Sequence, residues 1–252
     1  MKNFIKSYWK TLVFFTLSGV IGGFCVGLYL MDSYPAEVVA EIQAQGLTPF
    51  LLGLVSAYQA AGYGLILGAL GIFLAKKIGL WKDGRNFDRR PLLASIIVAL
   101  VGGVGIILPD LLYFGNHIPA VADSYLAKPT PVFILGSVIY GGVIEEVMVR
   151  LFLMSGIAFL LHKLFGKGRQ APAVWVPVAA NIVSALLFAA GHLPTTIMLL
   201  GLTPMILVRC FLLNGTFGLL FGWLYGKYGL RYAMVAHAGC HVVSKAIWLL
   251  FV

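Results

Sequence analysis

The stretch "GGVIEEVMVR", residues 141–150, places Glu145, Glu146 and Arg150 inside an apolar run that extends over residues 132–161. A charged side chain near the middle of a bilayer costs roughly 2.5–3.5 kcal/mol on insertion scales. Three such side chains so close together need an explanation. The residues alone are compatible with two explanations. Either they form ion pairs that only hold helices together, or one of them is a catalyst.

The whole chain has the composition of an integral membrane protein. Of its 252 residues, 60% are hydrophobic and 11% are charged, and its mean hydropathy is +0.95. Soluble domains carry about 25% charged residues, so this composition excludes a soluble globular protein. Cys25, Cys210 and Cys240 lie in apolar runs, which is typical of buried side chains rather than of a disulfide framework or a CxxC metal site.

Apolar runs long enough to cross a bilayer recur along the chain. A helix needs about 20 residues to span the hydrocarbon core, at a rise of about 1.5 Å per residue. The backbone in lipid must satisfy its own hydrogen bonds, and a barrel would show short alternating strands instead. We therefore expect an all-α, polytopic membrane helix bundle. Its seven spans, or eight if a long one breaks, lie at about 11–31, 50–75, 91–114, 132–161, 174–202, 205–226 and 231–252.

Basic residues are concentrated in every second connection between these runs. Residues 1–10, 76–90, 162–171 and 227–231 hold 14 of the 18 Lys and Arg residues, and the other connections hold only Lys128. The positive-inside rule then places the N-terminus and the basic loops in the cytoplasm. The net charge of +9 is thus a topology signal that also favours contact with bilayer headgroups. We expect no nucleic-acid partner. We expect a multi-pass protein of a bacterial plasma membrane.

Few ionisable side chains remain within the expected spans. Glu146 and Arg150 are four residues apart, so they share a helix face, and the acid precedes the base, which is the better order for an ion pair. Glu145 projects about 100° around the helix and can face a different space. We expect Asp110 to be solvated at the outer end of the third span, and Lys245 to snorkel or to pair with a carboxylate.

Three histidines complete this set. His192 has Phe188 one turn before it, and alone it would indicate only a hydrogen bond to a neighbouring helix. His237 and His241 share one face, and the small residues between them let another backbone or a substrate approach. A carboxylate with imidazoles can activate water and stabilise an oxyanion. Hydrolysis therefore stands beside structural ion pairing as a hypothesis.

The charged residues and histidines resemble three motifs of the CAAX protease and bacteriocin-processing family, EExxxR, FxxxH and HxxxN. They read "EEVMVR" at 145–150, "FAAGH" at 188–192 and "HAGCH" at 237–241. The resemblance covers about residues 131–252, which we take as the catalytic core. Residues 1–130 match only in being hydrophobic, and we expect one integral membrane domain overall.

The resemblance implies an intramembrane endopeptidase that acts on a peptide or a membrane-anchored protein, with or without a lipid group. It implies that Glu145 is the general base, that His192 helps to activate the water, and that His237 stabilises the oxyanion. The family's asparagine is replaced by His241. An imidazole N–H can donate as an amide does, but it also titrates near neutral pH, which leaves the oxyanion geometry open.

Glu146 and Arg150 resemble the orienting pair of the family, in agreement with their shared face. Two other interpretations stay open. The same four residues, Glu145, His192, His237 and His241, can be zinc ligands, although the sequence has no HExxH motif; no other cofactor is expected. The remaining alternative is a non-catalytic membrane protein of the bacteriocin-immunity or transport type.

A shared site requires the histidines to lie at one depth. His237 lies about seven residues from the cytoplasmic start of its helix, whereas His192 would lie near the outer face if the fifth span ended at Pro194. We therefore expect the fifth span to continue to about Leu202 with a kink at Pro194. The site would then open toward the cytoplasm.

Overall fold

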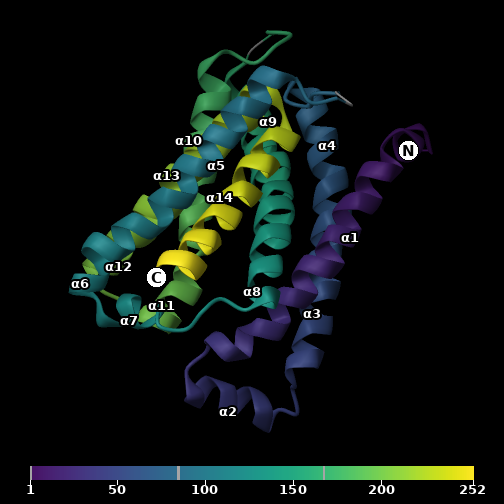
Figure 1. Cartoon of the computed structure of the whole chain (residues 1–252). Coiled ribbons are helices and arrows are strands. Elements are labelled where there is room, and N and C mark those ends of the chain that lie inside the picture. The colour runs from purple at the N-terminus through teal and green to yellow at the C-terminus, as the bar shows by residue number, and fades with distance from the viewer. Residues whose placement is uncertain (1, 84–85, 167) are drawn as a thin grey trace.

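A computed structural model describes residues 2–83, 86–166 and 168–252, and these residues form helices without any strand (Figure 1). Within these described ranges, seven helical stretches are long and apolar enough to cross a membrane, which confirms the expected count. They cover Lys6–Ser33, Pro49–Lys77, Arg89–His117, Pro131–Phe165, Trp175–Leu200, Pro204–Tyr228 and Leu230–Phe251.

Most spans contain more than one helical element, because π-helical segments (η) interrupt the α-helices. The first three spans and their connections consist of α1 (Lys2–Ser33), α2 (Ala36–Ala44), α3 (Pro49–Gly62), η1 (Tyr63–Leu67), α4 (Gly68–Lys77), α5 (Arg89–Pro109), η2 (Asp110–Phe114), α6 (Gly115–His117) and α7 (Pro119–Asp123). The last four consist of α8 (Pro131–Gly136), η3 (Ser137–Met154), α9 (Ser155–Phe165), α10 (Trp175–Gly191), α11 (Leu193–Leu200), α12 (Pro204–Cys210), η4 (Phe211–Gly215), α13 (Thr216–Tyr228) and α14 (Leu230–Phe251).

The charged segment η3 lies at the centre of the bundle. It packs against α1, α4, α10 and α14, while α1 runs along α3 and α14 runs along α5 (Figure 1). Close approach to α14 depends on glycine, because a Cβ on Gly142 would meet the Cβ of Ala238 at 2.6 Å. Small residues let membrane helices pack at such short range. The sequence therefore brings the carboxylates of η3 against the histidines of α14.

The fourth span begins at a defined cap. Thr130 accepts a hydrogen bond of 3.2 Å from the backbone N–H of Phe133, and Pro131 occupies the first turn, where its missing N–H costs nothing. The α-helical start gives way to π-helical bonding over Ser137–Met154. Such wider turns are rare and are frequent at functional sites. Here they cover the whole "GGVIEEVMVR" stretch.

The fifth span continues past Pro194, as expected, to Leu200. The interruption falls at His192, which lies between α10 and α11. Because proline lacks an N–H and crowds the carbonyl four residues earlier, Pro194 is tolerated in the first turn of α11 but not in the middle of one continuous helix. His192 is thereby held within the span at a break in the backbone.

Asp110 is buried rather than solvated, so that expectation was wrong. Its side chain accepts from Arg209 of α12 twice, at 2.7 Å from Nε and 2.5 Å from Nη2, and from the hydroxyl of Tyr125 at 2.9 Å. Burial and the nearby carboxylate of Asp110 raise the pKa of Tyr125. This network ties the ends of the third and sixth spans to the connection that follows α7.

Candidate active site

Glu146 and Arg150 form a buried ion pair on η3. Nη1 of Arg150 lies 3.2 Å from Oε1 of Glu146, and both side chains are almost completely enclosed. Nη2 of Arg150 donates to the backbone carbonyl of Gly218 on α13 at 3.0 Å. Its guanidinium also lies 4.6 Å from the ring centroid of Phe188 on α10. The pair therefore holds η3 to two other spans, which is the role expected from its spacing.

His237 of α14 lies between the two neighbouring glutamates. Its Nδ1 is 2.8 Å from Oε1 of Glu146, and its Nε2 is 3.7 Å from Oε2 of Glu145. Since an ionised carboxylate only accepts, Nδ1 carries the proton and donates it to Glu146. The ring also stacks on Phe221 of α13, with centroids 4.5 Å apart and planes 17° apart. One hydrogen bond and one aromatic face thus fix its orientation.

Glu145 differs from its neighbour in exposure. Its side chain is 22% exposed, whereas that of Glu146 is fully buried. The 3.7 Å between Glu145 and Nε2 of His237 is too long for a direct hydrogen bond. A separation of this kind is one that a water molecule can bridge. The two adjacent carboxylates therefore have different environments: Glu146 is buried and paired with Arg150, whereas Glu145 is partly exposed.

His192 joins the same aromatic cluster from the end of α10. Its Nδ1 lies 2.8 Å from the carbonyl oxygen of Phe188, so this nitrogen carries a proton and Nε2 is an acceptor when the ring is neutral. The Phe188 ring contacts His192 at 4.7 Å and His237 at 6.1 Å between centroids. Within the described ranges, His192 makes no ion pair with Glu145; the two are connected through Phe188 and His237.

His241 stacks on His237, with ring centroids 5.0 Å apart. Nζ of Lys245 lies 3.5 Å from Nδ1 of His241 and 5.0 Å from the ring centroid of Phe133. An ammonium only donates, so this contact makes Nδ1 the acceptor and leaves the proton on Nε2. That nitrogen faces Gly141, where a Cβ would collide with it. A glycine of the opening stretch therefore makes room for a donor.

The contacts of Lys245 differ from those expected from the sequence. Its ammonium contacts His241 and Phe133 and so is directed back along α14 rather than to a carboxylate. In the part of the chain that the structure describes, the ion pairs involve other cations, namely Arg150, Arg209 and the His237 ring.

Two contributors to this cluster carry no sequence motif. Gly218 supplies the carbonyl that Arg150 binds, and Phe221 supplies the face on which His237 stacks. Both lie on α13, where apolar and small residues at helical spacing are ordinary for a membrane span. The sequence offered no signal that could have distinguished them.

The arrangement of the possible metal ligands does not favour the zinc hypothesis. Across residues 2–83, 86–166 and 168–252, no group of three or more His, Cys, Asp or Glu side chains is placed to hold a metal ion. Nδ1 of His241 accepts from Lys245, so the proton of this ring is on Nε2 and neither nitrogen has a lone pair available for a metal ion. The residues do not fit a zinc site in this arrangement.

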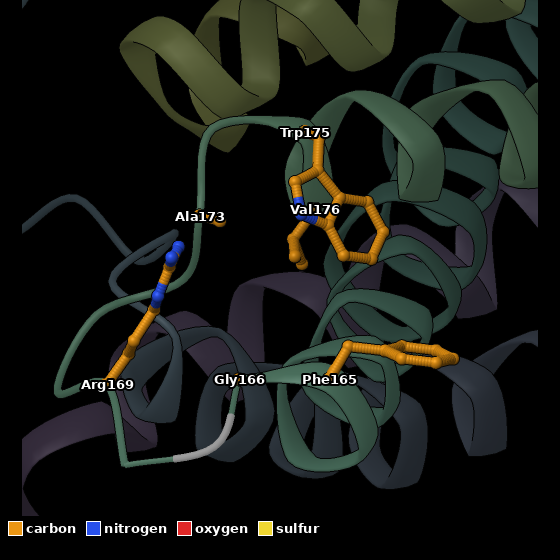
Figure 2. A pocket seen from close by; sticks show the side chains of 6 residues that line it. All are labelled: Phe165, Gly166, Arg169, Ala173, Trp175 and Val176. Carbon is orange, nitrogen blue, oxygen red and sulfur yellow. The ribbon is translucent and has the colours of Figure 1, made fainter.

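A small pocket elsewhere is separate from the charged cluster. It has a volume of about 280 Å³ and lies where α9 ends and α10 begins, with Arg169 and Trp175 among its lining side chains (Figure 2). None of the candidate site residues lines it. Its position in the loop after the fourth span makes it part of the surface at the basic end of the bundle.

Comparison with known families adds a finding that covers the same elements. Residues 127–243 match the family model described as type II CAAX prenyl endopeptidase, Rce1-like. The match includes the three segments 145–150, 188–192 and 237–241, whose side chains meet in the structure. No curated protein and no solved structure matches the chain.

Proposed function

The chain carries, over residues 127–243, a domain of the Rce1-like family of type II CAAX prenyl endopeptidases, and from this membership we propose that it is an intramembrane endopeptidase. It hydrolyses a peptide bond of a membrane-associated peptide or protein. We assign the catalytic core to residues 131–252. In this proposal residues 1–130 supply the helices that frame the core, since α1 and α4 both pack against η3.

The arrangement of His237 between two unlike carboxylates is the observation that carries the proposal. Glu146 is fully buried, forms an ion pair with Arg150 and accepts a hydrogen bond from the imidazole of His237. Glu145 faces the same imidazole across 3.7 Å and is partly exposed. Two carboxylates with such different surroundings are suited to different roles. Glu145 is therefore the general base.

In the proposed reaction, Glu145 accepts a proton from water as the water oxygen bonds to the scissile carbonyl carbon. The carbonyl π pair moves to oxygen and forms an oxyanion. When this intermediate collapses, the carbon–nitrogen bond breaks, its electron pair stays on nitrogen, and Glu145 returns the proton to the leaving amine. His192 contributes by holding the water, because its Nε2 is free to accept while Nδ1 is bound to the carbonyl of Phe188.

The oxyanion is stabilised by His237 and His241 in this mechanism. Nε2 of His241 carries a proton when Nδ1 accepts from Lys245, so it can donate as the family's asparagine amide does. Nε2 of His237 donates when both of its ring nitrogens are protonated. Removing one donor of this kind typically costs about 10²–10³ in rate.

Glu145→Gln tests the proposal, because it keeps the shape of the side chain and removes its basicity. Membrane peptides from cells with the native chain are compared by proteomics with those from cells with the variant. We expect a precursor to remain uncleaved in the variant. If Glu145→Gln supports full biological function, the catalytic hypothesis fails, and the immunity or transport alternative takes its place.

A further inference from the structure

A larger cavity lies at the end of the bundle that carries the N-terminus and the basic loops. Its volume is about 510 Å³, within the range of about 300–1,000 Å³ that is typical of ligand sites. The first turns of α1, the connection between α4 and α5, and the start of α14 form its walls. The residues proposed for catalysis do not line it, so the mechanism above leaves this cavity without a role.

The lining of this cavity changes from polar to apolar with depth. Helices α1 and α14 both enter the bundle from this end (Figure 1). Ser7 and Arg231 line the cavity near the starts of these helices, whereas Phe14 and Met234 line it further along. Seven residues of α1 correspond to a rise of about 10 Å. The cavity therefore has a polar mouth and an apolar interior, which matches an amphiphile.

Positive charge predominates at the mouth. Lys82 and Arg231 both line the mouth. The ammonium of Lys76 donates a hydrogen bond of 2.6 Å to the hydroxyl of Tyr8, which also lines the cavity. Asp83 is the acid in the lining, and its carboxylate accepts from the indole N–H of Trp81. The mouth is therefore suited to an anion.

The two cations are positioned by neighbouring groups. The stem of Lys82 lies over Gly229, whose φ of +108° and close contact exclude an ordinary side chain. Its Nζ donates to the carbonyl of Gly79 at 3.3 Å. The guanidinium of Arg231 lies 5.2 Å from the ring centroid of Phe87 and 4.8 Å from that of Tyr232. These contacts hold both charges at the entrance.

We propose that this cavity binds an anionic phospholipid of the surrounding bilayer. Its phosphate lies between Lys82 and Arg231, and one acyl chain extends along Phe14 and Met234. Phe14 is 51% exposed, so the apolar part is continuous with the lipid-facing surface of α1. Basic residues close to an anionic leaflet contribute about 1 kcal/mol each to such binding. A soluble anion would leave the apolar interior unfilled.

A lipid in this position braces the start of α14 against α1. Met234 lies three residues before His237 on the same helix, so the bound lipid supports the element that presents the imidazoles. The inference goes beyond the proposed endopeptidase activity and does not depend on it. Its tests can therefore use binding and stability alone.

The experiment uses the full chain in nanodiscs of phosphatidylcholine, with or without phosphatidylglycerol. Bound lipid is counted by native mass spectrometry, and thermal unfolding is followed in parallel. We expect phosphatidylglycerol to be retained and to raise the unfolding temperature, while inorganic phosphate does neither. Equal retention of the two lipids, or equal protection by free phosphate, would overturn the proposal.

Lys82→Gln is the informative variant because Lys82 is exposed and its loss should not disturb folding. We expect roughly fivefold weaker retention of phosphatidylglycerol, from the loss of one interfacial charge. Lys10→Gln is the matched control, since Lys10 lies on α1 but does not line the cavity. Thr11→Phe fills the cavity without changing charge and should also displace the lipid. Native retention in both cavity variants would contradict the assignment.

Discussion

Glu146 accepts a hydrogen bond of 2.8 Å from Nδ1 of His237, and the same carboxylate oxygen lies 3.2 Å from Arg150. One oxygen therefore holds both an imidazole and a guanidinium. Oε2 of Glu146 is buried without a hydrogen-bond partner among the described residues. Glu146 thus belongs to the support of the site, whereas its partly exposed neighbour Glu145 faces the other nitrogen of the same imidazole.

Substitution of the two glutamates should separate stability from catalysis. Glu146→Gln leaves Arg150 as an uncompensated buried charge, and breaking a buried pair costs about 3–5 kcal/mol. We expect a clearly lower unfolding temperature together with lost hydrolysis. Glu145→Gln should lose hydrolysis with little change in unfolding temperature, because its side chain is partly exposed and 3.7 Å from its partner. Thermal unfolding in detergent and a peptide cleavage assay measure both quantities; equal destabilisation would contradict this division of roles.

His192→Ala should impair hydrolysis without destabilising the bundle. Among the described residues, the His192 ring makes a hydrogen bond only to the carbonyl of Phe188 on the same span, so its removal breaks no hydrogen bond between spans there. General acid–base partners contribute about 10²–10⁴ in rate, and we expect a loss of kcat in that range.

His117→Ala is the matched control for His192→Ala. Its Nδ1 lies 2.8 Å from the carbonyl of Tyr113 one turn earlier, and its ring packs on that tyrosine, which is the local geometry of His192 and Phe188. His117 lies at the end of the third span, away from the glutamates. The control should cleave peptide as the native chain does. An equal loss in both variants would show that the effect of His192 is not specific.

The effects on kcat of substituting Lys245 and His241 should depend on each other. Lys245→Met removes the donor that keeps the proton of His241 on Nε2, and we expect kcat to fall at least tenfold with little change in KM. His241→Asn introduces an amide that donates without any choice of tautomer, so Lys245→Met should have little effect in that background. The double-mutant cycle measures this coupling. Additive losses would assign Lys245 a purely structural role.

Much of the bundle could be predicted from the sequence because spans depend on local composition. Hydropathy located all seven spans, and the four-residue spacing of Glu146 and Arg150 indicated their ion pair. The depth argument on His192 indicated that the fifth span continues beyond Pro194. The first two inferences use residues close together along the chain, whereas the third compares the depths of His192 and His237 on two different spans.

Contacts between spans were harder to predict, because hydropathy does not specify how helices are ordered or rotated in the bundle. Asp110 and Arg209 are 99 residues apart, and nothing near Asp110 in the sequence indicates its partner. The placement of His237 between both glutamates likewise depends on the approach of α14 to η3. Gly142 permits that approach, although a glycine pair in a membrane helix has many other uses.

Metal removal tests the zinc alternative directly. Since the described residues contain no group of three side chains placed to hold a metal ion, and both nitrogens of His241 are occupied, we expect hydrolysis to be retained after chelation and dialysis. Metal content of the active preparation is measured by mass spectrometry alongside the rate. Activity that disappears on chelation and returns with stoichiometric zinc would establish the metal-dependent mechanism instead.

The ion pair between Asp110 and Arg209 should stabilise the bundle without taking part in the reaction. Asp110→Asn leaves Arg209 without its counter-charge, and because that arginine is 20% exposed we expect a cost of about 3 kcal/mol, at the low end for a buried pair. Asp123→Asn, at an exposed acid of α7, is the control and should leave the unfolding temperature unchanged. Adding Arg209→Gln to Asp110→Asn should cost less than the two single changes together, because the pair is then lost only once. Thermal unfolding measures all four proteins, and hydrolysis per folded molecule should stay at the native level in each; a selective loss of kcat in Asp110→Asn would instead connect this end of the bundle to the reaction.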